Sequence, residues 1–304
     1  MEDHASIVRN WEDMNTDILL KLFQSFDIFE LTSAIPRVCS TWRMVASDPV
    51  LWGTLDLSML KSNFIKTTQE PYIYVESRSC QTLTRVLKIA SNLSRGNILT
   101  LIFRYDLYVR DDQLTYTAER CPRLKRLVMP AWNLIKKSGI CSAIRVWKDL
   151  ESLTMPAIEN PAYLIEEIGK NCKNFAELKI MGPFDMLFAS ALVSFLPNLK
   201  VLSLRCSVVW MNALIVVLDR LPKLEVLNIS HCILIETSPL AQGMILRELD
   251  GSILEKASRL REFLTCIDDW CIMCQRTRKD EGLVRWYKYE EELWKADEVR
   301  SLSL

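Results

Sequence analysis

One apolar phrase returns along this chain at a nearly constant spacing. The phrase reads GNILTLIFR at 96–104, CPRLKRLVMP at 121–130, WKDLESLTMP at 147–156, CKNFAELKIM at 172–181, LPNLKVLSLR at 196–205 and LPKLEVLNIS at 221–230. The leading apolar residues of these six copies are separated by 26, 26, 25, 24 and 25 residues, and they are Ile98, Leu124, Leu150, Phe175, Leu199 and Leu224. A period held this closely predicts a solenoid, in which each repeat buries its apolar face against its neighbours. Such an array presents an extended surface, which is typical of chains that bind other proteins.

The residues inside and between these phrases indicate the kind of repeat. The L-x-x-L-x-L core is typical of leucine-rich repeats, which have a strand and a helix in each unit. The intervening segments have helical apolar spacing at 110–120, 134–146, 160–171, 185–195 and 211–221, although Gly139 makes the second the least regular. The 160–171 segment is the clearest, with Asn160 as a candidate cap and Pro161 in the first turn. The sequence therefore predicts an α/β chain.

The repeats fade at both ends, as expected where the outermost units must seal the core. LWGTLDLS at 51–58 is predicted to be an incomplete strand unit with Trp52, Leu55 and Leu57 directed inward, and a helix is expected at 82–93. ILRELDGSIL at 245–254 is predicted to be a last, degraded unit. We therefore expect a solenoid of about six to eight units over residues 58–255, with clear repeats at 96–230, and a C-terminal cap and tail over residues 256–304.

Residues that alternate with the inward apolar positions of each strand should face the concave side of the solenoid. This set comprises Thr100, Ile102, Arg126, Val128, Ser152, Thr154, Glu177, Lys179, Val201, Ser203, Val226 and Asn228. The candidates for target contacts among them are Arg126, Val128, Thr154, Glu177, Lys179, Ser203 and Asn228. A solvated sheet face without a ligand is the alternative, and the mixture of side chains does not identify a target.

Residues 11–52 have a different pattern. The stretch 11–26 places apolar residues at helical spacing behind a cap at Asn15 or Thr16, and a short turn at Asp27 and Ile28 leads into FELTSAI. Pro36 is expected to open a third helix, PRVCSTWRMVAS, with one apolar stripe. Three short helices make too small a core to be stable alone, so this module is expected to complete its core on a partner.

The run DILLKLFQSFDIFELTSAIPRVCSTWRMVASDPVLW at 17–52 resembles an F-box. The match rests on Ile18–Leu19, Leu22–Phe23, Phe26, Leu31, Val38–Cys39, Trp42, Asp48–Pro49 and Leu51–Trp52. Together with the repeats, the chain resembles the F-box/leucine-rich-repeat proteins, most closely those of plants, with a three-helix F-box over residues 11–57. The family usually has Leu-Pro where this chain has Met14-Asn15, and the absence of a first-turn proline should loosen the start of the first helix.

The resemblance implies a non-catalytic substrate-recognition subunit of a Skp-cullin-F-box ubiquitin ligase. Its partners would be a Skp-type adaptor, a cullin held through that adaptor, and a protein substrate that the sequence does not identify. By position, the residues matching the family's adaptor-facing or box-core positions are Ile18, Leu19, Leu22, Phe23, Val38, Cys39, Trp42 and Trp52. Two alternatives stay open: a receptor for a hormone-like small molecule, and an F-box scaffold that acts outside any ligase.

Composition argues against several other classes of protein. With 38 basic and 38 acidic side chains and no basic stripe, the chain lacks the footprint of a nucleic-acid binder. No apolar run is long enough for a bilayer span, and MEDHASIVRN is too polar for a secretory signal, so we expect no membrane contact and a cytoplasmic or nuclear location. Two histidines and no phosphate-binding glycine motif argue against an enzyme, and no cofactor is expected.

The ten cysteines are expected to be reduced thiols. Cys121 and Cys172 occupy the place that Trp147, Leu196 and Leu221 fill in other repeats, which predicts a buried apolar slot.

Cys266, Cys271 and Cys274 lie close together in CIDDWCIMCQRTRKDEG. We expect them to pack in the end cap without a metal. The alternative is a zinc site, whose fourth ligand would be His231 or Cys232. The aromatic residues of the last stretch, Trp286, Tyr287, Tyr289 and Trp294, are expected to pack under the final repeat, with a partner-binding patch as the alternative.

Overall fold

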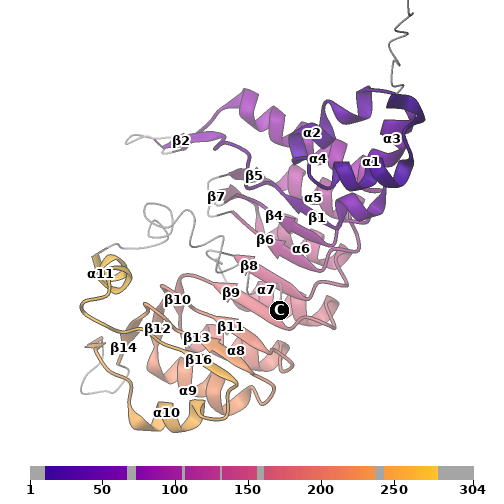
Figure 1. Ribbon diagram of the computed structural model, residues 1–304. Coiled ribbons are helices and arrows are strands. Elements are labelled where there is room, and N and C mark those ends of the chain that lie inside the picture. The colour runs from indigo at the N-terminus through magenta and orange to yellow at the C-terminus, as the bar shows by residue number, and fades with distance from the viewer. Residues whose placement is uncertain are drawn as a thin grey trace, which may run out of the picture.

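Eight parallel strands line the inner side of a curved array, and helices cover the outer side (Figure 1). The computed structural model describes residues 11–66, 73–104, 107–130, 132–155, 161–236 and 243–279. The strands of the main sheet, in spatial order, are β1 (Thr54–Asp56), β4 (Thr100–Ile102), β6 (Arg126–Val128), β8 (Ser152–Met155), β9 (Glu177–Ile180), β11 (Val201–Ser203), β13 (Val226–Asn228) and β16 (Glu262–Leu264). Spatial order follows chain order, so each repeat lies beside the one that precedes it.

A single column of leucines explains why the period is so regular. The central inward residue of each strand pairs in register with that of the next, in the order Leu55, Leu101, Leu127, Leu153, Leu178, Leu202, Leu227 and Phe263. The seven leucines are at most 1% exposed. Burying one such side chain stabilises the fold by about 1.5–3 kcal/mol, so a shift in register would be costly at every strand.

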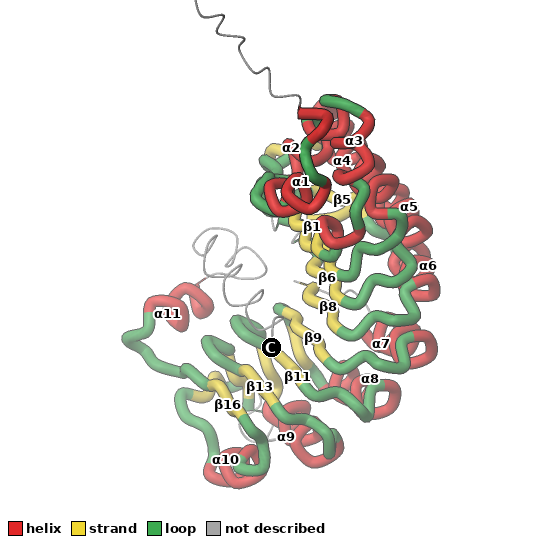
Figure 2. The backbone as a smooth tube through the Cα atoms, turned by 45° about the vertical axis from the view of Figure 1, so that its right-hand side comes forward, coloured by secondary structure: helices red, strands yellow, loops and turns green. Residues whose placement is uncertain are grey.

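Helices alternate with these strands along the outer side (Figure 2). They are α4 (Ser77–Ser94), α5 (Asp111–Arg120), α6 (Lys137–Val146), α7 (Pro161–Asn171), α8 (Met186–Phe195), α9 (Met211–Arg220) and α10 (Gly251–Ala257). All five helical segments predicted between the repeats are confirmed, although α6 begins at Lys137 rather than at 134. The helix expected at 82–93 is longer at its start, because its first turn begins at Ser77.

Two glycines allow the outer helices to approach one another closely. A Cβ at Gly139 would lie 1.7 Å from Asp111 Oδ1, an atom that accepts a hydrogen bond from the Lys136 amide. A Cβ at Gly169 would lie 2.3 Å from the Phe195 carbonyl oxygen. Gly139 lowers the helical propensity of its segment, but packing against α5 requires its small size.

The predicted apolar slot at the ends of the helices is confirmed. Its occupants are buried, and they are Cys121, Trp147, Cys172, Leu196 and Leu221. Trp147 Nε1 donates to the Cys121 carbonyl at 3.0 Å, and Cys172 Sγ donates to the Trp147 carbonyl at 3.3 Å. Burial raises the pKa of the Cys172 thiol to about 12, which keeps it neutral and suited to packing. The slot therefore joins neighbouring repeats by hydrogen bonds as well as by apolar contact.

Short strands that the sequence analysis did not predict form further sheets beside the main one. One contains β10 (Pro183–Phe184), β12 (Val208–Trp210), β14 (Ile233–Ile235) and β15 (Ile245–Leu246). A second pairs β5 (Tyr108–Arg110) with β7 (Trp132–Leu134), and a third pairs β2 (Phe64–Lys66) with β3 (Ile73–Val75). These strands have two or three residues each, too few for alternation to be recognised in the sequence.

The C-terminal end of the sheet differs from the prediction. Ile245 and Leu246 belong to β15, which pairs antiparallel with β14 instead of extending the main sheet. The last strand of the main sheet is β16, which lies beyond the predicted solenoid end at residue 255. Leu260 and Phe263 have the same spacing as Leu224 and Leu227, but a step of 36 residues from the preceding unit conceals the match.

The N-terminal module consists of 3-10 helix η1 (Trp11–Asp13), α1 (Thr16–Phe23), α2 (Ile28–Thr32), 3-10 helix η2 (Ile35–Arg37), α3 (Ser40–Ala46) and 3-10 helix η3 (Pro49–Trp52). Asn15 is the cap of α1, because its Oδ1 accepts from the Asp17 amide at 2.8 Å. The third helix begins at Ser40 rather than at Pro36. Cys39 is in an extended conformation, which interrupts the helix, and its Sγ accepts from the Trp42 amide at 3.4 Å.

The N-terminal module and the repeats share one apolar core. As predicted, Trp52, Leu55 and Leu57 are buried, and Trp52 Nε1 donates to the Ala46 carbonyl at 2.7 Å. The cluster of buried side chains runs from Leu19 through the strands to Ala257. The module is therefore fixed in position relative to the repeats. None of the helices within the described ranges combines the length and apolar character that a bilayer crossing requires.

Candidate functional site

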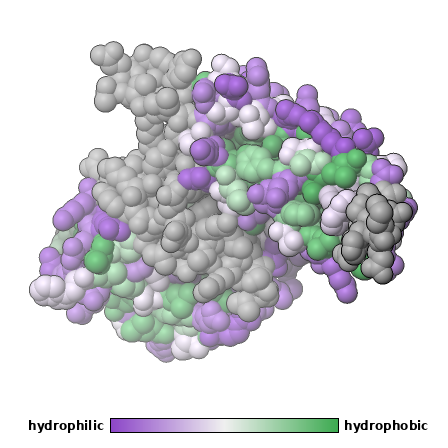
Figure 3. Space-filling model, turned by 45° about the horizontal axis from the view of Figure 1, so that its top comes forward, coloured by the Kyte–Doolittle hydropathy of each residue, from purple (hydrophilic) through white to green (hydrophobic). Residues whose placement is uncertain are grey.

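Exposed apolar side chains gather on the N-terminal helices. Among the described residues, six of the sixteen exposed large hydrophobic side chains belong to residues 11–52, and they are Trp11, Ile18, Leu22, Val38, Met44 and Val50. Figure 3 shows green apolar areas among purple polar ones at the end of the molecule where α1 and α3 lie. Exposed apolar side chains concentrated in this way are typical of a surface that a partner covers.

The structure divides the eight residues predicted for adaptor binding into three groups. Ile18, Leu22 and Val38 are exposed. Cys39 and Trp42 are half-buried. The remaining three, Leu19, Phe23 and Trp52, are at most 1% exposed, so they are core residues and cannot contact a partner in this conformation.

Core contacts hold the exposed residues in place. The rings of Phe23 on α1 and Trp42 on α3 meet edge to face with centroids 5.2 Å apart, and Trp42 Nε1 donates to the Trp11 carbonyl. Ile18 and Leu22 are one helical turn apart, so they lie on the same face of α1. The apolar surface is therefore preorganised by the residues beneath it.

The seven residues predicted for target contact lie in two rows across the inner face of the sheet. Pairing in register places Arg126 and Glu177 in the first row, on either side of Ser152. It places Val128, Thr154, Lys179, Ser203 and Asn228 in the second row. The structure thus brings together residues that are about 100 positions apart along the chain.

The seven side chains predicted for target contact differ in their exposure. Val128, Thr154, Lys179 and Ser203 are buried, whereas Arg126, Glu177 and Asn228 keep part of their surface. Four of the buried side-chain polar atoms that lack a hydrogen-bond partner in the described part of the chain belong to this inner face, namely Arg126 Nη1, Ser152 Oγ, Thr154 Oγ1 and Glu177 Oε2. Each unsatisfied atom costs about 1–3 kcal/mol, so this face suits a ligand that offers polar groups.

The C-terminal cysteines meet a histidine from the preceding repeat. The ligand-type atoms of His231, Cys266, Cys271 and Cys274 all lie within 4.8 Å of one another. Cys232, the other candidate for the fourth position, instead donates its thiol to the Leu204 carbonyl at 2.9 Å. The structure therefore selects His231 from the two candidates, and it brings together the three cysteines that were expected only to pack in the end cap.

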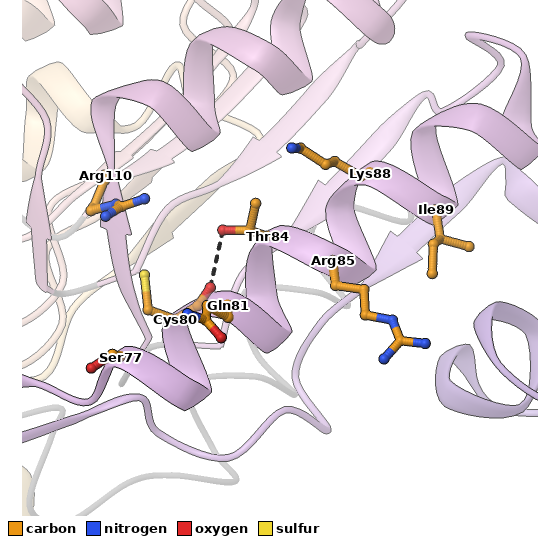
Figure 4. A pocket seen from close by; sticks show the side chains of 8 residues that line it. All are labelled: Ser77, Cys80, Gln81, Thr84, Arg85, Lys88, Ile89 and Arg110. Carbon is orange, nitrogen blue, oxygen red and sulfur yellow. Dashed lines mark hydrogen bonds between the residues drawn. The ribbon is translucent and has the colours of Figure 1, made fainter.

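A cavity of about 470 Å³ lies beside α4, on the outer side of the array (Figure 4). Arg85, Lys88 and Arg110 line it, together with Thr84, whose Oγ1 donates to the Cys80 carbonyl at 3.0 Å. Arg110 is already paired with Asp112, at 2.9 Å. No residue predicted for a site lines this cavity.

His4, the four aromatic residues of the last stretch and the tail beyond Lys279 lie outside the described residues.

Comparison with known proteins shows similarity over nearly the whole chain. F-box/LRR-repeat protein At3g48880 of Arabidopsis thaliana is 61% identical over 300 residues, which cover 98% of this chain and 97% of that protein. Putative F-box protein At4g11580 is 27% identical over 99% of this chain and 98% of its own length, and putative F-box/LRR-repeat protein 22 is 25% identical over 93% and 85%. Both are also from Arabidopsis thaliana. No family model matches the chain.

Proposed function

This chain belongs to the F-box/LRR-repeat protein family, and we propose that it is a non-catalytic substrate-recognition subunit of a Skp-cullin-F-box ubiquitin ligase. The observation that carries this proposal is the exposure of the apolar side chains of Ile18, Leu22 and Val38 in the N-terminal module. A Skp-type adaptor would bury these side chains and connect the chain to a cullin. Amphipathic helices commonly gain their stability in a complex in this way.

The proposal assigns the parts of the chain as follows. Residues 11–57 form a three-helix F-box, the solenoid of about six to eight units extends from residue 58 through β16, and the residues after β16 belong to the cap and tail. Since one core joins the F-box to the repeats, the distance between adaptor and target is fixed. A rigid connection of this kind raises the effective concentration of a target near the ubiquitin-transfer machinery.

The inner face of the sheet is the proposed target site. Arg126 and Glu177 carry opposite charges on either side of Ser152, two strands apart. Their strands are about 9–10 Å apart, and Arg126 Nη1 and Glu177 Oε2 are both buried without a hydrogen-bond partner among the described residues. A target segment with an acidic group for Arg126 and a basic group for Glu177 would satisfy both buried atoms. We place this activity in the cytoplasm or the nucleus.

The buried polar atoms of the inner face also fit the second candidate function, a receptor for a hormone-like small molecule. The two candidates differ in a simple measurement. A small ligand that occupies this face raises the melting temperature of the purified chain, and the rise grows with the logarithm of the ligand concentration above Kd. A subunit that binds only proteins shows a constant melting temperature across the same compounds.

The ligase proposal is tested by adaptor-dependent binding to a cullin. The chain is co-expressed with a Skp-type adaptor and passed over an immobilised cullin. Retention only in the presence of the adaptor is the expected result, and Leu22→Lys should abolish it because a charge would enter the apolar contact. Lys21→Ala, an exposed position on the same helix, is the matched control.

Adaptor binding without cullin retention would contradict the ligase proposal and favour a scaffold outside any ligase.

A second experiment seeks the target by proximity labelling in cells with the proteasome blocked. It compares the wild type with the charge reversals Arg126→Glu and Glu177→Arg. Proteins whose labelling falls in both variants are candidates for substrates that use the inner face.

A further inference from the structure

We propose that His231, Cys266, Cys271 and Cys274 form a structural zinc site at the C-terminal end of the array. Three thiolates and an imidazole are a ligand set that zinc prefers, and four protein ligands make a closed tetrahedral site. This site is independent of adaptor binding, because its residues come from the last repeat and from the segment that follows β16.

Three of the six distances between the ligand atoms are close to the edges of a zinc tetrahedron, and all six are within 4.8 Å. With Zn–S near 2.3 Å and Zn–N near 2.0–2.1 Å, the edges are about 3.8 Å between two sulfurs and about 3.6 Å between sulfur and nitrogen. Cys266 Sγ lies 3.7 Å from Cys274 Sγ. His231 Nδ1 lies 3.6 Å from Cys271 Sγ and 3.3 Å from Cys274 Sγ. The two sulfurs are also well beyond the bonding distance of a disulfide, about 2.05 Å.

The fold brings the histidine and the first cysteine together through the backbone. His231 follows β13 in the left-handed region with a φ of 60°, as Cys206 does at 58° one repeat earlier. The His231 amide donates to the Cys266 carbonyl at 2.8 Å, which joins the turn after β13 to the turn after β16. Histidine is among the residues that tolerate this conformation, which recurs in the turns after β11 and β13.

The other two ligands stand at the start of α11 (Ile272–Lys279). Cys271 precedes the helix and Cys274 lies in its first turn, in the C-x-x-C spacing that zinc sites use. The positive end of the helix dipole favours thiolates at this position. Met181, Cys206 and Met273 form a small buried cluster that Cys271 packs against, so apolar side chains shield one side of the site.

Other chemistries fit these four residues less well. A cysteine nucleophile requires one thiol beside one imidazole, whereas three thiols converge on His231 here. A catalytic zinc keeps an open coordination position, and four protein ligands leave none. Binding Zn²⁺ to three thiols and a neutral imidazole releases three protons and leaves a site with a net charge of −1.

The role that follows is to close the end of the solenoid. In the described part of the chain, α11 lies on the strand side of the array, away from α8 and α9 (Figure 1). A metal that binds both turns and the start of α11 would fasten this segment to the last repeat. Terminal units of a repeat array need such a seal because no further repeat covers them.

The test measures zinc in the full-length chain purified with its tag removed. Elemental analysis is expected to find about one zinc per chain, and the double variant Cys271→Ser/Cys274→Ser should hold at least about tenfold less. Cys232→Ser is the matched control: this thiol is next to His231 and is not a ligand, and a serine hydroxyl can still donate to the Leu204 carbonyl. The control should keep its zinc.

Two substitutions at His231 test the fourth ligand without requiring the cysteine variant to fold. His231→Cys should retain about one zinc per chain as a four-cysteine site, since Cys206 already adopts the same backbone conformation. His231→Asn preserves the left-handed preference but provides no ring nitrogen, so its zinc content should fall at least about tenfold. Cobalt loaded in place of zinc should give the intense visible absorption of tetrahedral thiolate coordination in the wild type.

Three results would overturn the proposal. The first is a reduced wild-type chain that holds no zinc even after Zn²⁺ is added. The second is a Cys232→Ser variant that loses zinc as completely as the double variant. The third is a disulfide between Cys266 and Cys274 in the chain isolated from cells with its thiols trapped by alkylation.

Discussion

Alanine at both Ile18 and Leu22 is expected to weaken adaptor binding while leaving the fold intact. These side chains are 53% and 44% exposed, so an adaptor can bury about half of each. Full burial of a large aliphatic side chain contributes about 1.5–3 kcal/mol, which makes each residue worth about 1 kcal/mol in the complex. Together they amount to about 2 kcal/mol, an increase in Kd of about 30-fold.

Leu19 lies on the same helix and should behave in the opposite way. It is completely buried, and Leu19→Ala is expected to lower the free energy of unfolding by about 2–5 kcal/mol because a cavity remains in the core. The Kd of the folded fraction should change little, since the side chain cannot touch the adaptor. Substitutions at neighbouring residues of α1 would thus affect adaptor binding and stability separately.

The assay combines titration calorimetry with purified adaptor and urea denaturation of each variant. Lys21→Ala, with an exposed side chain on α1, should affect neither quantity. The reasoning would be refuted by a double variant whose Kd stays within about twofold of the wild type. It would also be refuted if Leu19→Ala weakened binding at unchanged stability.

Substitutions at three further positions test the packing of the repeats. Trp147→Phe removes the hydrogen bond to the buried Cys121 carbonyl and should lower the free energy of unfolding by about 2–4 kcal/mol in urea denaturation; an unchanged midpoint would contradict this. Arg259→Met removes donors from three carbonyls at the end of α9 and should cost about 2 kcal/mol in the same assay, whereas Arg259→Lys should cost less if charge is the main contribution. Hydrogen bonds from Arg145 lower the pKa of the Glu167 carboxyl, so its contribution to stability is present above the ordinary value of 4.5 and is lost as pH falls through the lowered value. Glu167→Gln should therefore flatten the fall in melting temperature below about pH 5, and an identical pH profile would count against it.

The repeat architecture was predictable because one physical requirement acts at every strand. Each strand of the main sheet places a leucine, or Phe263 in β16, in the same column. The period of the sequence therefore follows from the register of the sheet. Where that requirement meets a long insertion, prediction fails. The segment between Asn228 and Glu262 contains β14, β15 and α10, and this insertion conceals the unit that ends in β16.

The candidate sites were harder to predict for two different reasons. Helical spacing identified apolar residues on α1, but Leu19 and Phe23 are buried while Ile18 and Leu22 remain exposed. The apolar stripe of α1 is wider than the part of it that packs in the core. Helical spacing alone therefore does not show which of its residues remain exposed. For the zinc ligands, local sequence shows only the C-x-x-C pair, whereas the backbone contact between His231 and Cys266 depends on how the last two strands pair.

The most direct test of the central claim is hydrogen–deuterium exchange of the full-length chain with and without a Skp-type adaptor. We expect slower exchange in the amides of α1 and α3 when the adaptor is bound, because Ile18 and Leu22 on α1 and Val38 just before α3 become covered. We expect unchanged exchange in β9 and β11, whose inner face is the proposed target site. Protection confined to those strands, with α1 and α3 unaffected, would contradict the account.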